Sequence, residues 1–121
     1  RGVELILGVR NDLDWGPILL AGFGGVQAEI THDVRLMTPD LTKAQILREL
    51  DALKSAPLLR GFRGSPPLDV DAVADLIGIL GRMMLGSPRV REIDLNPVVV
   101  YPAGRGAIAL DALMPVQAAS A

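Results

Sequence analysis

The feature that most constrains the fold is an alternating run near the C-terminus. In Glu92-Ile-Asp-Leu-Asn-Pro97 the polar and apolar side chains alternate. Because side chains at i and i+2 of a strand share a face, Glu92, Asp94 and Asn96 point one way and the intervening apolar residues point the other. Residues 98–101 continue the strand, residues 102–105 form a plausible four-residue loop, and residues 107–111 return. The pattern predicts a β-hairpin over residues 91–111.

The register of this hairpin gathers oxygen-bearing side chains. If Tyr101 pairs with Gly106, Asn96 lies directly across from Asp111. Opposed Cβ atoms in an antiparallel pair are about 5 Å apart. An amide oxygen and a carboxylate at that separation could share a hard cation such as Mg²⁺, which takes oxygen ligands. The alternative interpretation is a charged outer face on an amphipathic strand, and the pattern names no substrate.

The rest of the chain predicts an α+β fold, a mostly antiparallel sheet with helices packed on one face. Apolar runs at 3–9, 18–21, 26–30 and 33–37 are separated by turn-rich segments at 11–17 and 22–25. Thr42 and Gln45 form a capping-box signature that opens one helix, and Asp69 opens a second. A Gly- and Pro-rich connection at 56–68 joins them. Two glycines inside the second helix, Gly78 and Gly81, predict close packing against the sheet.

Composition limits the class of protein. The chain has 121 residues, is 50% hydrophobic, and has enough length for one domain and one core. Its net charge is −2 and it has no basic cluster, which argues against nucleic-acid binding. No apolar run reaches the roughly 18 residues of a membrane span, and no signal-peptide pattern opens the chain. The absence of cysteine excludes disulfides and Cys-ligated zinc. We expect a cytoplasmic domain that is part of a larger protein.

Five ordered blocks identify a family resemblance. They are Val3-Glu-Leu-Ile-Leu-Gly-Val9, residues 16–29, residues 58–64, Glu92-Ile-Asp-Leu-Asn-Pro97 and Leu110-Asp-Ala112. Together they resemble the C-terminal half of the ATP-grasp domain of NDP-forming acyl-CoA synthetases. That group includes ADP-forming acetyl-CoA synthetase and is kin to the succinyl-CoA synthetase β-subunit. The match covers nearly the whole chain.

The resemblance implies a reaction and a site. The family makes acyl-CoA from an acid, CoA and ATP through a phosphohistidine on another domain, with ATP or ADP and Mg²⁺ held by the ATP-grasp domain. The family's metal ligands match Asn96 and Asp111, and Asp94 occupies an acidic position that contacts the metal through water or orients Asn96. Residues 1–115 would be the C-terminal ATP-grasp subdomain, and residues 116–121 a linker or tail. Its partners would be the N-terminal subdomain and the CoA-binding and phosphohistidine domains, without which this chain is expected to be inactive.

Two further positions are candidates for nucleotide binding. Gly24 and Gly25, in the segment Gly22-Phe-Gly-Gly25, could present backbone N–H groups to a phosphate. The alternative is a β-turn that needs glycine. Glu29 follows this segment and could approach the nucleotide or the metal, or it could be a solvated strand residue. Glu4, on the first strand, is a weaker candidate of the same kind.

Other conspicuous side chains receive structural interpretations. His32, the only histidine, is expected to be a surface residue, because the family's phosphorylated histidine belongs to another segment. Arg60 and Arg63 are expected to fix their loop by pairing with carboxylates. Trp15 is expected to anchor the turn beside Pro17 as a buried group.

One departure from the family pattern supports a second hypothesis. After Leu110-Asp-Ala112 the family commonly has a basic residue, and here it is Leu113. This favours an alternative in which the chain is a regulatory or structural ATP-grasp remnant within a multidomain acyl- or acetyltransferase. The presence of a phosphohistidine domain or of an acetyltransferase domain in the full-length protein would separate the two.

Overall fold

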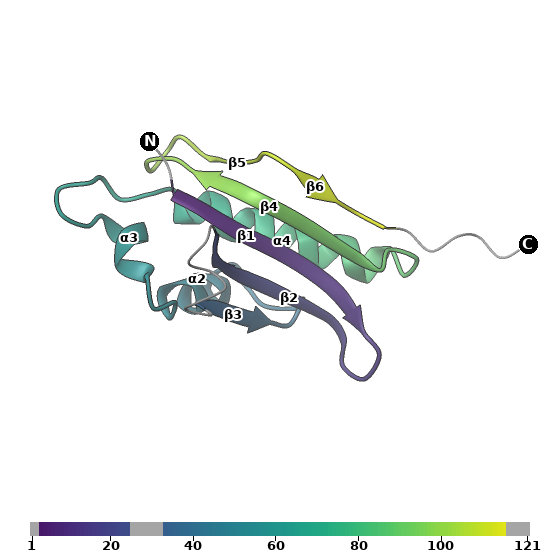
Figure 1. Ribbon diagram of the computed structural model, residues 1–121. Helices are drawn as coiled ribbons and strands as arrows, with labels where there is room; N and C mark the ends of the chain where they lie inside the picture. Colours follow the sequence, from purple (N-terminus) through teal and green to yellow (C-terminus); the bar gives the residue numbers. More distant parts are fainter. Residues whose placement is uncertain (1–2, 25–32, 116–121) are drawn as a thin grey trace, which may run out of the picture.

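Six strands form one antiparallel sheet in the computed structural model, within the residues 3–24 and 33–115 that it describes (Figure 1). Their order across the sheet is β3-β2-β1-β4-β5, with β6 also paired to β4. The strands are β1 (Val3–Asp12), β2 (Gly16–Phe23), β3 (Val34–Met37), β4 (Glu92–Val100), β5 (Ala107–Ala109) and β6 (Ala112–Leu113). The predicted α+β class with a mostly antiparallel sheet is confirmed.

The described residues form three helices, of which α4 and α2 pack on one face of the sheet, and α3 lies beside the sheet in Figure 1. They are α2 (Lys43–Asp51), α3 (Ala56–Arg60) and α4 (Val70–Gly86). Helix α2 begins with the predicted capping box: Thr42 Oγ1 accepts from Gln45 N–H (3.2 Å), and Gln45 Oε1 accepts from Thr42 N–H (2.8 Å). Helix α4 begins at the predicted N-cap, Asp69. Both helices therefore begin where their capping side chains satisfy N–H groups that the first turn leaves unpaired.

The core lies between the sheet and the helices. Alternate residues of β1 and β2, among them Leu5, Leu7 and Leu19, are buried on the helix-covered face. They pack with α4 residues such as Val73 and Ile77. The other face of the sheet carries Glu4, Gly8 and Arg10 of β1 and has no helix over it among the described elements. This uncovered side is called the outer face below.

A β-bulge interrupts β4 next to β1. The register runs from Val3↔Val100 to Leu5↔Val98 and then shifts by one residue, so that Leu7 pairs with Leu95. The extra residue lies in Asn96–Pro97, opposite Ile6. As a result, the buried positions of β4 switch from odd-numbered residues before the bulge, Ile93 and Leu95, to even-numbered residues after it, Val98 and Val100. Bulges of this kind redirect side chains locally, and this one occurs at the Asn-Pro pair.

The prediction of a turn over residues 22–25 is wrong at residues 22 and 23. Gly22 and Phe23 belong to β2, and Gly22 pairs with Val34 of β3. A Cβ on Gly22 would lie 2.6 Å from Val34 Cγ1 and 2.9 Å from the Asp33 carbonyl oxygen. The glycine therefore permits close strand approach and does not form a turn at this point.

The predicted connection at 56–68 contains an extra element. Helix α3 (Ala56–Arg60) occupies its start, with Pro57 in the first turn, where proline is tolerated. The strand predicted at 26–30 and the surface residue His32 lie outside the described residues.

Gly81 packs closely, but against a loop. A Cβ there would lie 2.9 Å from the Pro39 carbonyl oxygen, in the turn before α2. A Cβ on Gly78 would have one neighbour within 4 Å among the described residues, the Arg82 Nη1 atom of the same helix, at 3.4 Å. The prediction that both glycines pack against the sheet is therefore wrong.

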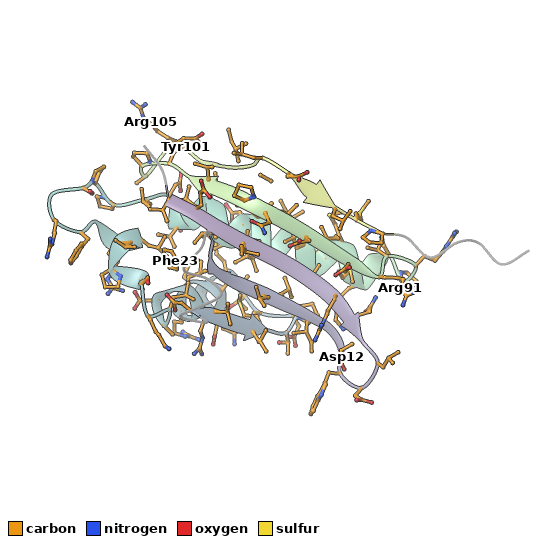
Figure 2. The ribbon with its side chains drawn as sticks, in the orientation of Figure 1. Asp12, Phe23, Arg91, Tyr101 and Arg105 are labelled. Atoms are coloured by element: carbon orange, nitrogen blue, oxygen red, sulfur yellow. The ribbon has the colours of Figure 1, made fainter. Side chains whose placement is uncertain are left out.

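Trp15 is exposed, contrary to the prediction. Its side chain is 81% accessible in the turn between β1 and β2. The turn is held by Asp12, labelled in Figure 2, whose carboxylate accepts from the N–H groups of Asp14 (2.9 Å) and Trp15 (3.1 Å). These two hydrogen bonds lower the pKa of Asp12. A polar cap, and no apolar anchor, stabilises this turn.

Candidate functional site

Strand β4 presents its acidic and amide side chains on the outer face. Glu92 and Asn96 are exposed, Asp94 is half-buried, and the intervening Ile93 and Leu95 are buried in the core. The alternation predicted from the sequence is therefore present up to the bulge. The strand is long and paired on both sides, to β1 and to β5 and β6, which fixes the backbone beneath these three side chains.

The hairpin has the predicted register. Tyr101 N–H donates to the Gly106 carbonyl (3.0 Å), and Val98 pairs with Ala109. Past the bulge, Asn96 N–H donates to the Asp111 carbonyl (3.2 Å). Asn96 therefore lies across from Asp111, as predicted.

The two side chains share the outer face. Asp94 pairs directly with Leu113 of β6. Asn96 follows Asp94 by two residues within β4, so strand alternation places it on the face of Asp94. Asp111 lies between β5 and β6, and its register opposite Asn96 assigns it to the same face. Both are exposed. Asp111 Oδ1 accepts from Ala112 N–H (2.9 Å), and no hydrogen bond to Oδ2 is present among residues 3–24 and 33–115.

A groove on the outer face lies beside Asp94. It has a volume of about 410 Å³ and crosses β2, β1 and β4. Gly8 of β1 pairs with Asp94, and the position of a Cβ there would be 3.8 Å from Asp94 Oδ1, so glycine leaves the space over the carboxylate open. The groove's lining is apolar at one end and charged at the other: Ile6, Ile18, Leu20, Leu36, Arg10, Glu92 and Asp94. This combination suits a ligand with a flat apolar part and a charged part.

The site lacks a complete protein cage for a metal. Within residues 3–24 and 33–115, no group of three or more His, Cys, Asp or Glu side chains could hold a metal ion. The available donors, an amide oxygen and carboxylates, suit Mg²⁺, which binds through one or two carboxylates and completes its shell with waters and phosphates. The described residues therefore fit Mg²⁺ only where other ligands complete its coordination shell.

The glycine segment is only partly described. Gly24 N–H donates to the Glu4 carbonyl (3.0 Å), extending the β1–β2 ladder, so this amide is already engaged. Its predicted role toward a phosphate would require that hydrogen bond to break. Gly25 and Glu29 lie outside the described residues. Glu4 is exposed on the outer face, where it pairs with Val99 of β4.

Arg60, the last residue of α3, and Arg63, in the loop that follows, have different partners. Arg60 forms an ion pair with Asp51, as predicted. The Arg63 guanidinium lies over the Phe62 ring, 5.3 Å from its centroid, and not on a carboxylate in the contacts described. Neither arginine lines the outer-face groove.

Sequence reasoning missed one part of the site and one long-range contact of the hairpin that carries it. The apolar end of the groove comes from Ile6, Ile18 and Leu20, which are half-buried on the outer face, and alternation along β1 and β2 was the available signal. Asp69 was predicted only as a helix start. Its carboxylate also accepts from Gly104 N–H (3.1 Å) and Gly106 N–H (2.8 Å) of the hairpin loop, which no local pattern indicates.

Comparisons with known proteins agree with this geometry. The profile of the ATP-grasp domain family matches residues 1–116. The chain is 58% identical to a trans-feruloyl-CoA synthase from an unknown prokaryotic organism, over 96% of this chain and 16% of that protein. It is 38% identical to the β-subunit of ADP-forming acetate–CoA ligase I of Pyrococcus furiosus, over 93% of this chain and 48% of the subunit.

A solved structure supports the same assignment. The dinucleotide-forming acetyl-coenzyme A synthetase 1 of Ca. Korarchaeum cryptofilum superposes with a TM-score of 0.89 at 35% identity, over 97% of this chain and 54% of that one. That protein was solved in complex with coenzyme A and Mg-AMPPCP, with its phosphohistidine segment pointing towards the nucleotide binding site. The chain thus spans about half or less of these relatives.

No helix in the described part of the chain has the length and apolar character needed to cross a membrane.

The family profile covers almost all of the sequence, and the sheet, hairpin and helices agree with it. The chain therefore belongs to the ATP-grasp domain family.

Proposed function

We propose that residues 1–115 are the C-terminal ATP-grasp subdomain of an NDP-forming acyl-CoA synthetase, which makes acyl-CoA from an acid, CoA and ATP. The chain would supply one side of the nucleotide clamp, and the N-terminal subdomain would supply the other. The observation that carries the proposal is the outer face, where Asn96 lies across from Asp111 beside Asp94 and the groove. Relatives with acyl-CoA synthetase names over 91–96% of this chain support it.

Each residue would have a distinct role at the nucleotide. Asp111, through Oδ2, and Asn96, through its amide oxygen, would hold Mg²⁺. Asp94 would bind a water of the metal or orient Asn96. When bound, the ion would neutralise negative charge on the phosphate oxygens, the main requirement in phosphoryl transfer. Gly25 and Glu29 remain proposed nucleotide contacts, and Gly24 would contribute only if its amide were released.

The other partners would lie outside this chain. We propose that a CoA-binding domain and a phosphohistidine domain, in the same protein or in a partner subunit, complete the enzyme in the cytoplasm. The relative at 58% identity is a trans-feruloyl-CoA synthase, and several others are acetate–CoA ligases. Ferulate and acetate are therefore the first acids to test.

The test is acyl-CoA formation by the full-length protein across a Mg²⁺ titration. Asp111→Ala should raise the Mg²⁺ concentration for half-maximal activity by at least roughly 10-fold, since even an outer-shell ligand partner is worth about 10–100-fold in metal affinity. Asn96→Ala should have a smaller effect, because an amide carries no net charge. The matched control is Asp14→Ala, which removes an exposed carboxylate from the β1–β2 turn. Equal Mg²⁺ dependence of Asp111→Ala and wild type would overturn the proposal.

A second candidate rests on Leu113. This side chain is 60% exposed in β6, beside Asp94, at the position where the family commonly has a basic residue. In this alternative the chain is a regulatory or structural ATP-grasp remnant in a multidomain acyltransferase. Nucleotide binding by the full-length protein without acyl-CoA formation from any acid would favour it, and Leu113→Lys would then test whether the lost cation matters.

A further inference from the structure

The segment that carries Asp111, between β5 and β6, has little packing to hold it. From Ile108 to Met114 every residue is exposed, including four large apolar side chains. Strands β5 and β6 are short and are paired only to β4 within the described residues. A strand without a buried face does not fix its own register, because a slip exposes no additional apolar surface. The position of Asp111 must therefore be set elsewhere, and in a hairpin the turn sets it.

The turn of this hairpin is fastened to the start of α4. Figure 1 shows the β4–β5 turn and the start of α4 at the same end of the sheet, and Figure 2 marks the turn with Tyr101 and Arg105. Asp69 N–H donates to the Tyr101 carbonyl (2.8 Å), and Ala103 N–H donates to the Pro67 carbonyl (2.9 Å). Leu68, buried in the core, forms a bridge with Pro102. The turn is thus tied to a segment that is itself anchored.

The Asp69 carboxylate makes the central connection. One oxygen accepts from Ala72 N–H (3.1 Å) and caps α4. The other accepts from Gly104 N–H (3.1 Å) and Gly106 N–H (2.8 Å). Both glycines have positive φ (87° and 85°), the conformation that turns their amides toward one acceptor. The hydrogen bonds, that of Gly106 foremost, lower the pKa of Asp69, so the carboxylate is charged at neutral pH.

We propose that Asp69 is a positioning residue for the metal site: it sets the register of the hairpin and thereby places Asp111 across from Asn96. It acts through the turn and does not itself contact the ion. The inference rests on the proposed function only in taking Mg²⁺ as the ion that Asp111 binds.

One substitution, Asp69→Ser, separates the two roles of this residue, capping α4 and holding the hairpin turn. The serine side chain would still cap α4, because serine is as good an N-cap as aspartate, but its single short oxygen does not reach the glycine amides as well. The variant thus removes the carboxylate's hydrogen bonds to the turn and keeps both the helix cap and the backbone contacts of residues 67–69 with the turn. Thr42→Ala is the matched control: it removes the N-cap of α2, which touches no part of the hairpin in the contacts described.

The experiment uses the full-length protein and two readouts. Amide hydrogen exchange should become faster in Asp69→Ser at Asn96 and Leu110, whose N–H groups bond across the hairpin, and remain unchanged in α4. The Mg²⁺ concentration for half-maximal acyl-CoA formation should rise by about 10-fold, the cost of losing an outer-shell partner, while the rate at saturating Mg²⁺ is retained. Thr42→Ala should change neither readout.

The outcomes distinguish this inference from the proposed function. If wild type shows no Mg²⁺-dependent activity, the proposed function fails and the metal part of this inference fails with it, whatever the exchange data show. If wild type is Mg²⁺-dependent but Asp69→Ser matches it in both readouts, only the positioning role is overturned. Faster exchange with an unchanged Mg²⁺ requirement also overturns it, because the register would then not govern the site.

Discussion

Two glycines in one helix should respond differently to the same substitution. Gly78 and Gly81 both lie inside α4, where replacing glycine by alanine stabilises a helix by up to about 1 kcal/mol. At Gly78 the new methyl group would meet only the end of the Arg82 side chain, at 3.4 Å. That flexible group can move at little cost. We expect Gly78→Ala to stabilise the chain by roughly 0.5–1 kcal/mol.

Gly81→Ala gains the same helix term but introduces a backbone clash. Its methyl group would lie 2.9 Å from the Pro39 carbonyl oxygen and 3.3 Å from the Pro39 Cα. Overpacking of this kind costs about 1–3 kcal/mol. The net expectation is between no change and about 2 kcal/mol of destabilisation, so the two variants should differ by roughly 1–3 kcal/mol.

Urea denaturation of the 121-residue chain, followed by circular dichroism, measures this difference directly. The comparison is valid if the slopes of the two transitions agree, since a change in slope signals a change in the unfolded state or in cooperativity. If Gly81→Ala proves at least as stable as Gly78→Ala, then α4 does not pack against the Pro39 turn as described.

Three further predictions test other parts of the structure. Leu7→Ala should lower the free energy of unfolding by about 2–5 kcal/mol, because Leu7 is fully buried. Leu36→Ala should lower it far less, because Leu36 is 63% exposed on the outer face; urea denaturation compares the two variants. Trp15→Ala should change stability by no more than about 0.5 kcal/mol, measured in the same way, since this side chain is 81% exposed. Because hydrogen bonds lower the pKa of Asp69 in the folded state, its carboxylate should add stability at pH values above the ordinary carboxyl pKa, and this stability should be lost as the pH falls through the folded pKa. Asp69→Ala should therefore flatten the acid side of the curve of unfolding free energy against pH. An unchanged acid side would contradict the three hydrogen bonds.

The hairpin was predictable because its determinants are local. Alternation fixed which side chains of β4 share a face, and the four-residue loop fixed the pairing of Tyr101 with Gly106. From these two facts the opposition of Asn96 and Asp111 follows by counting. The capping box at Thr42 and the N-cap at Asp69 were predictable for the same reason, since each side chain satisfies N–H groups within three residues.

The errors arose where a distant segment decided the outcome. Gly22 resembles a turn glycine in the sequence, but it is required because Val34 of the neighbouring strand comes too close for a side chain. Trp15 resembles a turn anchor, but it is 81% exposed, and hydrogen bonds to the Asp12 carboxylate hold its turn. The contacts of Asp69 with Gly104 and Gly106 span 35 and 37 residues, which no periodicity encodes.

The most direct test of the site is the position of the metal in crystals of the full-length protein grown with Mn²⁺ and the ATP analogue AMPPCP. Mn²⁺ accepts the same oxygen ligands as Mg²⁺ and is located by its anomalous signal. The account predicts an ion roughly 2 Å from the Asp111 carboxylate and the Asn96 amide oxygen, bridging to the phosphates of the analogue. An analogue bound with its metal elsewhere, leaving both side chains without a ligand, would contradict it.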